Sequence, residues 1–315
     1  MTLVAECFEL RNMMPPGEDW CCACGVSAGA LLATLVGTIK YGDIHAFNAR
    51  FERARHQFEG GGEASPYRPW IPFGHFMNAV WALLTNKPSL FHGNKKFIFK
   101  EMQKHDLETS GRRVQVGYFD ERLQKYCTAD SKWHSFKTLR DAVAASCAVP
   151  VLLPPHGVLG SQCRDGGVAH TIPAHETIRW VDSYRGRTKV HVDLLLSDAL
   201  ETPPQPNSAG GVVNAAVDLS SSIVWLNLQR DLRLLCYKLL WDPSEDLDAV
   251  IMDLRSGKRR FFTRPWGTMR VVAPVDLTPK RRVRTSFRVP DKKMSDYLAQ
   301  RGAKAARRSC SGTKL

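Results

Sequence analysis

Ser27 is the residue whose neighbours best suit it to act as a nucleophile. It stands in the stretch Gly25-Val26-Ser27-Ala28-Gly29, which has the pattern Gly-x-Ser-x-Gly. A short apolar run over residues 20–24 predicts a buried strand before it, and residues 28–39 predict a helix after it. A strand, a sharp turn and a helix together form a nucleophile elbow, which presents a serine hydroxyl at the end of a sheet. The amide groups at the start of such a helix favour an alkoxide or an oxyanion.

The two glycines of this pattern are expected to be there for steric reasons. The turn is tight, so a side chain at Gly25 or at Gly29 would strike the neighbouring strand or helix. The five residues alone also fit an ordinary strand-to-helix turn that does no chemistry. A second motif is therefore needed before a reaction can be inferred.

That second motif is Asp165-Gly166-Gly167, which follows a predicted strand over residues 158–163. A small-residue helix is predicted over residues 138–147, and Pro150 prevents its continuation. An Asp-Gly pair alone most often starts a turn. Ester hydrolysis, however, needs a nucleophile, a base and a group that holds the oxyanion, and Ser27 with Asp165 could supply the first two.

The order of these features is similar to that of the patatin-like phospholipase family. The elbow, the small-residue helix ending in Ala148-Val149-Pro150, the Pro154-Pro155 pair and Asp-Gly-Gly occur in the family's order, and the resemblance runs from about Cys7 to about Leu235. Residues 227–235 look like a helix common in bacterial members. The resemblance implies that Ser27 is the catalytic nucleophile and Asp165 its sole general base. It also implies support of the elbow and the oxyanion by Gly25, Ala28, Gly29, Gly166 and Gly167.

The implied function is lipid acyl hydrolysis of the phospholipase A or lysophospholipase type, with a phospholipid or another acyl ester as substrate. Asp165 would take the proton of Ser27 and return it to the leaving alcohol, and a dry pocket would raise its basicity. The resemblance implies no cofactor. The three neighbouring cysteines, Cys21, Cys22 and Cys24, are followed by no Cys/His pair at zinc spacing, so we expect no metal.

A histidine is the alternative base. His170 and His175 follow Asp165 and satisfy the chain order Ser, Asp, His of α/β-hydrolases. The short step from Asp165 to His170 leaves little room for the separate loops of such a triad, so the Ser-Asp pair is the favoured interpretation.

The chain departs from the family upstream of the elbow. Family members carry a loop of the form Gly-Gly-Gly-x-Arg/Lys-Gly there, whereas the only glycines before Ser27 are Gly17 and Gly25. We therefore expect an N-terminally truncated fold in which the amides around Ala28 are the remaining oxyanion donors, and each lost donor costs about 10²–10³ in rate. Either the true start lies further upstream, or the protein is a catalytically impaired member with a binding role.

The alternation of predicted helices and strands indicates an α/β fold, and the resemblance implies three layers, α/β/α, around a mostly parallel central sheet. A hairpin is predicted over residues 114–127 and an interior parallel strand over residues 190–196. Further helices are predicted at about residues 3–10, 42–58, 73–84, 97–107 and 219–240, and late strands at residues 250–254 and 269–275.

Charge divides the chain of 315 residues into two parts. Residues 251–315 hold 18 Lys and Arg against 4 Asp and Glu, whereas the first 250 residues hold 26 against 27. We expect residues 1–279 to form the hydrolase domain and residues 280–315 to form a basic, flexible tail. Such a tail suits an anionic membrane surface. The tail lacks the aromatic interleaving typical of a single-strand binding platform, so nucleic acid is not the expected partner.

The sequence shows neither a secretory signal nor a membrane-spanning segment. No apolar run approaches the ~20 residues that span a bilayer. The N-terminal residues 1–10 lack the basic start of a secretory signal. The nine cysteines are an odd number and suit free thiols in a reducing compartment. We expect a cytoplasmic protein with peripheral contact to membranes.

Overall fold

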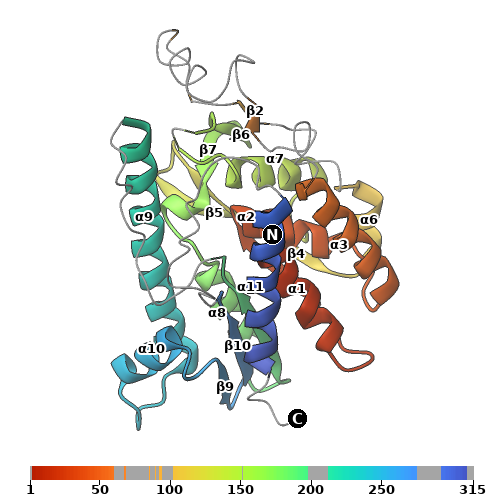
Figure 1. Cartoon of the computed structure of the whole chain (residues 1–315), viewed down its shortest axis with the longest axis vertical. Helices are drawn as coiled ribbons and strands as arrows, with labels where there is room; N and C mark the ends of the chain where they lie inside the picture. Colours follow the sequence, from red (N-terminus) through yellow and green to blue (C-terminus); the bar gives the residue numbers. More distant parts are fainter. Residues whose placement is uncertain are drawn as a thin grey trace.

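The computed structural model describes residues 2–59, 67–68, 85, 89, 92–93, 102–150, 152–197, 212–274 and 292–310, and these form an α/β fold (Figure 1). The helices are α1 (Thr2–Met13), α2 (Ala28–Gly37), α3 (Ile44–Glu59), α6 (Lys104–Thr109), α7 (Phe136–Ser146), the 3₁₀ turn η2 (Gly166–Val168), α8 (Ala174–Tyr184), α9 (Val212–Leu235) with its π-helical extension η3 (Cys236–Leu240), α10 (Leu247–Ser256) and α11 (Lys292–Cys310). The strands are β1 (Cys22–Val26), β2 (Tyr67–Arg68), β3 (His92–Gly93), β4 (Arg113–Asp120), β5 (Lys125–Asp130), β6 (His156–Val158), β7 (Ser161–Asp165), β8 (Val190–Leu195), β9 (Phe261–Arg264) and β10 (Gly267–Val272).

Strand β4 organises the first sheet, whose order is β1-β4-β7-β6 with β5 also paired to β4. Strand β1 runs parallel to β4, and the pairs β4-β5, β4-β7 and β6-β7 are antiparallel. The expectation of a mostly parallel sheet is therefore wrong, because short hairpins connect two of these pairs and a hairpin forces an antiparallel pairing. The predicted hairpin at residues 114–127 is confirmed. The single strand predicted at residues 158–163 instead spans the end of β6, a turn with Leu159 and Gly160 at positive φ, and the beginning of β7, which together form a second hairpin.

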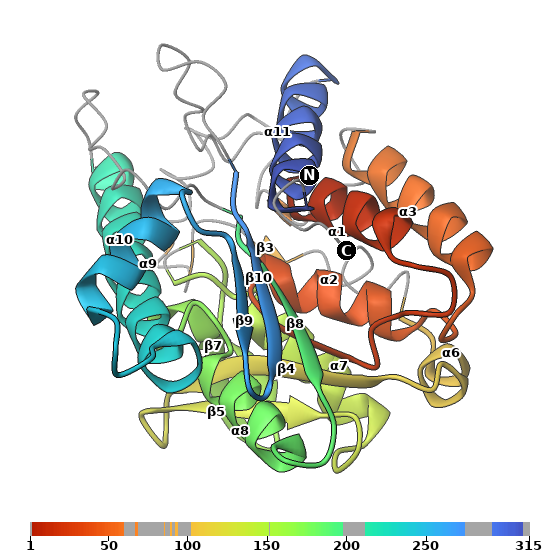
Figure 2. The ribbon, with the colours of Figure 1, turned by 90° about the horizontal axis from the view of Figure 1, so that it is seen from below.

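Helices cover both faces of this sheet, as the three-layer expectation requires. On one face, side chains of β4 such as Val114 and Val116 pack against α7 residues such as Leu139 and Val143. On the opposite face, Thr128 of β5 donates a hydrogen bond to Glu176 of α8. Figure 2 shows α7 and α8 with the first sheet between them.

A second sheet has the order β8-β10-β9, with β8 parallel to β10 and β9 antiparallel to it. Among the strands that the structure describes, β8 lies at the edge of this sheet, so its predicted interior position is wrong. The strand predicted at residues 250–254 is also wrong, because this segment lies within α10. Val250 and Leu254 are buried at a spacing of four, which suits a helix, and Gly257 at φ 76° ends it.

The helices at the two ends of the chain pack against each other. Residues 292–310, expected to be part of a flexible tail, form α11 beside α1 (Figures 1 and 2). A Cβ added at Gly302 of α11 would lie 2.3 Å from the Thr2 carbonyl oxygen, and Arg307 forms a 2.9 Å ion pair with Glu9. This part of the expected tail is therefore packed on the body of the protein.

Several expectations fall outside the described residues. These are the connection at residues 60–62, the helix at residues 73–84, the beginning of the helix at residues 97–107, and the boundary between residues 279 and 280. The expected division of the chain at that boundary stays a prediction.

Candidate active site

Ser27 lies in the turn between β1 and α2, as the elbow pattern predicts. Its backbone has φ 55°, a strained conformation for a residue with a side chain. A Cβ at Gly25 would lie 2.0 Å from the Gly29 carbonyl oxygen, so only glycine fits there. The expectation that Gly29 must also be a glycine is wrong for the described surroundings, because a Cβ added there meets no described atom within 4 Å. The strain at Ser27 is typical of a functional turn.

Asp165 meets Ser27 because β1 and β7 lie end to end along one edge of β4. Val26 of β1 pairs with Gly117, and Asp165 of β7 pairs with the next residue, Tyr118. Strand β5 occupies the other edge of β4 over residues 115–120. Since β1 runs parallel to β4 and β7 runs antiparallel to it, both strands end at the same point. There the Ser27 hydroxyl donates a 2.6 Å hydrogen bond to Asp165 Oδ2.

The Asp165 carboxyl group is buried but polar groups reach it. Its side chain accepts hydrogen bonds from Ser27 Oγ and, at 2.8 Å, from the Gly167 amide. Burial raises the pKa of Asp165 from 3.8 to about 6, although both hydrogen bonds act in the opposite direction. Removing water from around a carboxylate disfavours its charged form, so the ionised group is a stronger base than an exposed aspartate.

The amide groups around Ser27 differ in what they can bind. The Ser27 N–H donates to Ser146 Oγ at 2.8 Å, and Ser146 in turn donates to the Gly117 carbonyl at 2.6 Å. The Ser27 amide is therefore engaged. The amides of Ala28 and Gly29 begin α2, where N–H groups have no acceptor within the helix, and Ala28 is exposed. These two amides can face a ligand at the serine.

Gly166 and Gly167 allow close approach to groups other than the serine. A Cβ at Gly166 would lie 2.8 Å from the Gly117 carbonyl oxygen, so this glycine lets the turn after β7 press against β4. A Cβ at Gly167 would lie 3.1 Å from Asp165 Oδ1. These two glycines therefore allow close contacts with β4 and with the aspartate itself.

Helix α9 holds the backbone that follows the Asp-Gly-Gly motif. Asn227 Nδ2 donates to the carbonyls of Gly167 and Val168, both at 2.9 Å. Asp231, one turn further on and fully buried, accepts from the amides of Thr171 and Ile172 at 2.7 and 3.2 Å. We call this set of contacts the α9 clamp. Sequence reasoning marked residues 227–235 only as a helix, although two polar residues four positions apart among leucines were the available signal.

Of the histidines that follow Asp165, His170 lies in this clamp and His175 lies against its ring. His170 Nδ1 lies 2.8 Å from Asp231 Oδ1, and its ring makes edge contacts with Tyr126 and His175. His170 thus contacts α9, α8 and β5. This geometry gives no support to a histidine as the partner of Ser27.

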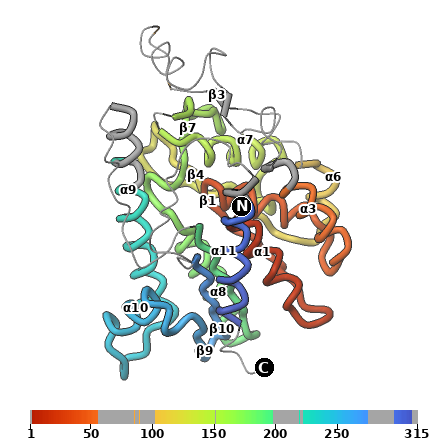
Figure 3. Tube along the Cα trace, in the orientation of Figure 1, coloured from red at the N-terminus to blue at the C-terminus, as the bar shows by residue number. Residues whose placement is uncertain are grey.

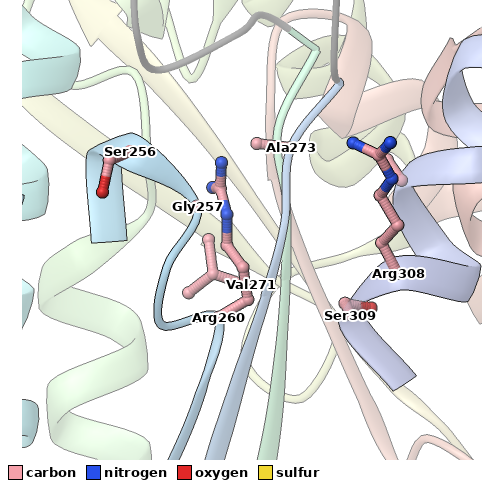
Figure 4. Close-up of a pocket in the computed structure, with 8 residues that line it drawn as sticks. Ser256, Gly257, Arg260, Val271, Ala273, Arg308 and Ser309 are labelled. Carbon is pink, nitrogen blue, oxygen red and sulfur yellow. The ribbon is translucent and has the colours of Figure 1, made fainter. Parts of the chain in front are cut away.

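A separate cavity of about 120 Å³ lies between the ends of α10 and α11 and strand β10 (Figure 4). Arg260 and Arg308 line it together with Ser256, Gly257, Val271, Ala273, Ala305 and Ser309. None of these residues belongs to β1, α2 or β7. The cavity is therefore distinct from the site at Ser27.

The fold and the site together define an α/β protein with an elbow serine hydrogen-bonded to a buried aspartate. The family model for Patatin-like phospholipase matches residues 15–178, which include β1, the elbow, β7 and the aspartate. The chain belongs to this family, whose members are lipid acyl hydrolases. No curated protein sequence matches the chain. Within the described part of the chain, no helix has the length and apolar character needed to cross a bilayer.

Proposed function

We propose that this protein hydrolyses acyl esters of lipids with Ser27 as nucleophile and Asp165 as general base. The observation that carries the proposal is the 2.6 Å hydrogen bond from the Ser27 hydroxyl to a carboxyl group whose pKa burial raises to about 6. A nucleophile and a base within hydrogen-bond reach are what covalent ester hydrolysis requires. Phospholipids of the type cut by phospholipases A, or lysophospholipids, are the proposed substrates.

The proposed reaction has two halves. Ser27 Oγ bonds to the acyl carbonyl carbon while its proton passes to Asp165 Oδ2. The bond from that carbon to the alcohol oxygen then breaks, and the alcohol leaves with the proton from Asp165. In the second half, water attacks the acyl-enzyme and gives a proton to Asp165. The carboxylic acid product departs, and the proton returns to Ser27.

The oxyanion formed in each half needs hydrogen-bond donors. The amides of Ala28 and Gly29 are the donors that we propose, because they lie at the positive end of α2 and have no acceptor within the helix. Gly25 would contribute by letting the elbow turn closely against α2, Gly166 by letting the aspartate turn press against β4, and Gly167 by leaving room beside the Asp165 carboxyl group.

The proposal is tested with a p-nitrophenyl acyl ester. Ser27→Ala and Asp165→Asn are each expected to lower kcat/KM by about 10³-fold or more, because each removes one half of the reacting pair. Ser183→Ala and Asp182→Asn, which change the same residue types on the exposed side of α8, serve as matched controls and are expected to keep wild-type rates.

A fluorophosphonate probe separates this proposal from the alternative of a binding protein on the same scaffold. Labelling of wild type and not of Ser27→Ala supports a reactive nucleophile. An intact fold that is neither labelled nor active on the ester or on lysophospholipid would contradict the hydrolase and favour the binding role.

A further inference from the structure

Helix α9 carries a row of exposed aliphatic side chains. Leu219, Ile223 and Leu226 are 63%, 40% and 66% exposed and lie four and three positions apart. At 3.6 residues per turn this spacing puts all three on one face of the helix. The opposite face carries the buried side chains Leu228, Leu232 and Leu235.

The same face continues toward the C-terminal end of α9 with charge and an aromatic ring. Arg230, Arg233 and Tyr237 follow Leu226 at helical spacing, and all three are exposed. We call the six residues from Leu219 to Tyr237 on this face the α9 stripe. A shallow hollow of about 290 Å³, lined by Arg230, Arg233, Leu234, Tyr237 and Leu247, lies at its basic end.

The stripe lies on a helix that also contacts the candidate active site. The Val224 carbonyl accepts a hydrogen bond from Thr171 Oγ1, and a Cβ at Gly167 would lie 3.9 Å from Val224 Cγ2. Through Asn227 the same helix holds the carbonyl of Gly167. The stripe thus lies on the same helix that holds the Asp165 turn, and at its basic end Arg230 donates a hydrogen bond to the Ala169 carbonyl just after that turn. Figure 3 shows α9 as a long segment along the flank of the molecule.

We propose that the α9 stripe is the surface by which this protein docks on an anionic phospholipid bilayer. This inference rests on the proposed function, because it explains how a lipid ester reaches Ser27. Leu219, Ile223 and Leu226 would enter the boundary between headgroups and acyl chains, where aliphatic side chains gain by leaving water. Tyr237 suits the headgroup level, where one end of its ring is apolar and the other is wet.

Charge identifies the kind of bilayer. Arg230 and Arg233 lie on the stripe, and Lys238 lies over the ring of Tyr237. Arg230 pairs with Asp231 and Arg233 pairs with Asp248 of α10, both at 3.2 Å, so Lys238 supplies the excess of positive charge at this end. Basic residues beside a membrane favour anionic lipids. A second copy of this chain would bring the same basic end, which makes it a poorer occupant.

The test measures binding to vesicles and hydrolysis separately. The full chain is sedimented with vesicles of phosphatidylcholine, with or without phosphatidylglycerol, as wild type, Leu226→Asp and Met252→Asp. Met252 is an equally exposed apolar residue on α10, outside the stripe, and is the matched control. Leu226→Asp is expected to lower the vesicle partition coefficient at least about tenfold, and Met252→Asp is expected to lower it less than twofold. Arg233→Gln is expected to weaken binding to the phosphatidylglycerol vesicles only.

Several results would overturn the docking surface. The proposal would be wrong if Leu226→Asp bound vesicles as well as wild type, or if Leu226→Asp and Met252→Asp lost vesicle binding equally. A change of oligomeric state in Leu226→Asp without a change in vesicle binding would assign the stripe to a second copy. If a charge reversal in α11, Lys304→Glu, abolished binding while Leu226→Asp did not, the C-terminal basic region would be the membrane contact.

Activity on the p-nitrophenyl ester distinguishes this inference from the proposed function. Leu226→Asp is expected to keep the wild-type rate on that ester and to lose hydrolysis of lipid in vesicles. Vesicle binding that depends on the stripe, without hydrolysis of either substrate, would support the docking surface and contradict the proposed hydrolase function. Ester hydrolysis together with vesicle binding that is unchanged by Leu226→Asp would support the hydrolase function and contradict the docking surface.

Discussion

At the scale of single residues, burial determines whether Asp165 can serve as a base. The carboxyl group is 5% exposed, and burial raises its pKa to about 6. The hydrogen bonds from Ser27 and Gly167 keep the charged form accessible, because each stabilises the carboxylate. The group is therefore mostly ionised at neutral pH while remaining more basic than an exposed aspartate.

This environment predicts how activity depends on pH. Only ionised Asp165 can accept the Ser27 proton, so kcat/KM is expected to rise with pH through an apparent pKa of about 6 and to level off above it. At pH 5 only about one tenth of the groups would be ionised, and at pH 7 about nine tenths. The measurement is kcat/KM on a neutral ester from pH 4.5 to 8. A profile that is flat over this range, with the fold intact by circular dichroism, would contradict the assignment.

At the scale of elements, helix α9 decides where the aspartate turn lies. The turn after β7 has no regular structure beyond the short η2, and its carbonyls and amides are held from outside by Asn227 and Asp231. The Gly167 carbonyl is buried, so losing its donor leaves that acceptor unsatisfied and costs more than the hydrogen bond itself. Asn227 is therefore a positioning residue for Asp165.

Removing this contact should affect turnover more than substrate binding. Asn227→Ala is expected to lower kcat about tenfold or more with little change in KM, because a small displacement of a catalytic group is costly. Leu232→Ala is the control, since Leu232 is buried on the same helix and contacts the core instead of the turn. It is expected to destabilise the protein by about 2–5 kcal/mol while keeping kcat.

The comparison of the two variants isolates positioning from stability. Asn227→Gln, which keeps the donor group, is expected to recover part of the lost kcat. Equal losses of kcat in Asn227→Ala and Leu232→Ala at matched folded fractions would show that α9 acts only through stability.

At the scale of the whole molecule, the two ends of the chain close the fold. Helix α11 buries Ala305 and Ala306 against a cluster that also contains Leu10 of α1 and Val272 of β10. Trp20, just before β1, packs against the same cluster and donates a 2.8 Å hydrogen bond from Nε1 to Asp193 of β8. This packing joins the first sheet to the second.

A substitution at the contact between α1 and α11 tests this closure. Gly302→Ala is expected to lower the free energy of unfolding by about 1–3 kcal/mol, because the new Cβ would lie 2.3 Å from the Thr2 carbonyl and the helices must separate. Lys304→Ala, on the exposed side of the same helix, is expected to change it by less than about 0.5 kcal/mol. Denaturant unfolding measures both. Equal stability of the two variants would mean that the C-terminal residues form a loose tail after all.

The local features of the site could be predicted from the order of amino acids alone. The elbow could be predicted at Ser27 because its conformation depends on five consecutive residues. Within them Gly25 must be a glycine, since a Cβ there would strike the first turn of the following helix. The hairpin of β4 and β5 was also predictable, because alternation and a short polar turn are local signals. Asp165 was found through the order of motifs, which is a property of the chain and needs no coordinates.

How these features come together could not be predicted in this way, because it depends on contacts between segments far apart in the chain. The end-to-end arrangement of β1 and β7 along β4 follows from pairings between distant segments, and no local pattern encodes their register. For the same reason the clamp by Asn227 and Asp231, the edge position of β8 and the packing of α11 on α1 were not predicted. Val250 and Leu254 illustrate the limit, since a short apolar run fits a strand or a helix equally well until its neighbours determine which face is buried.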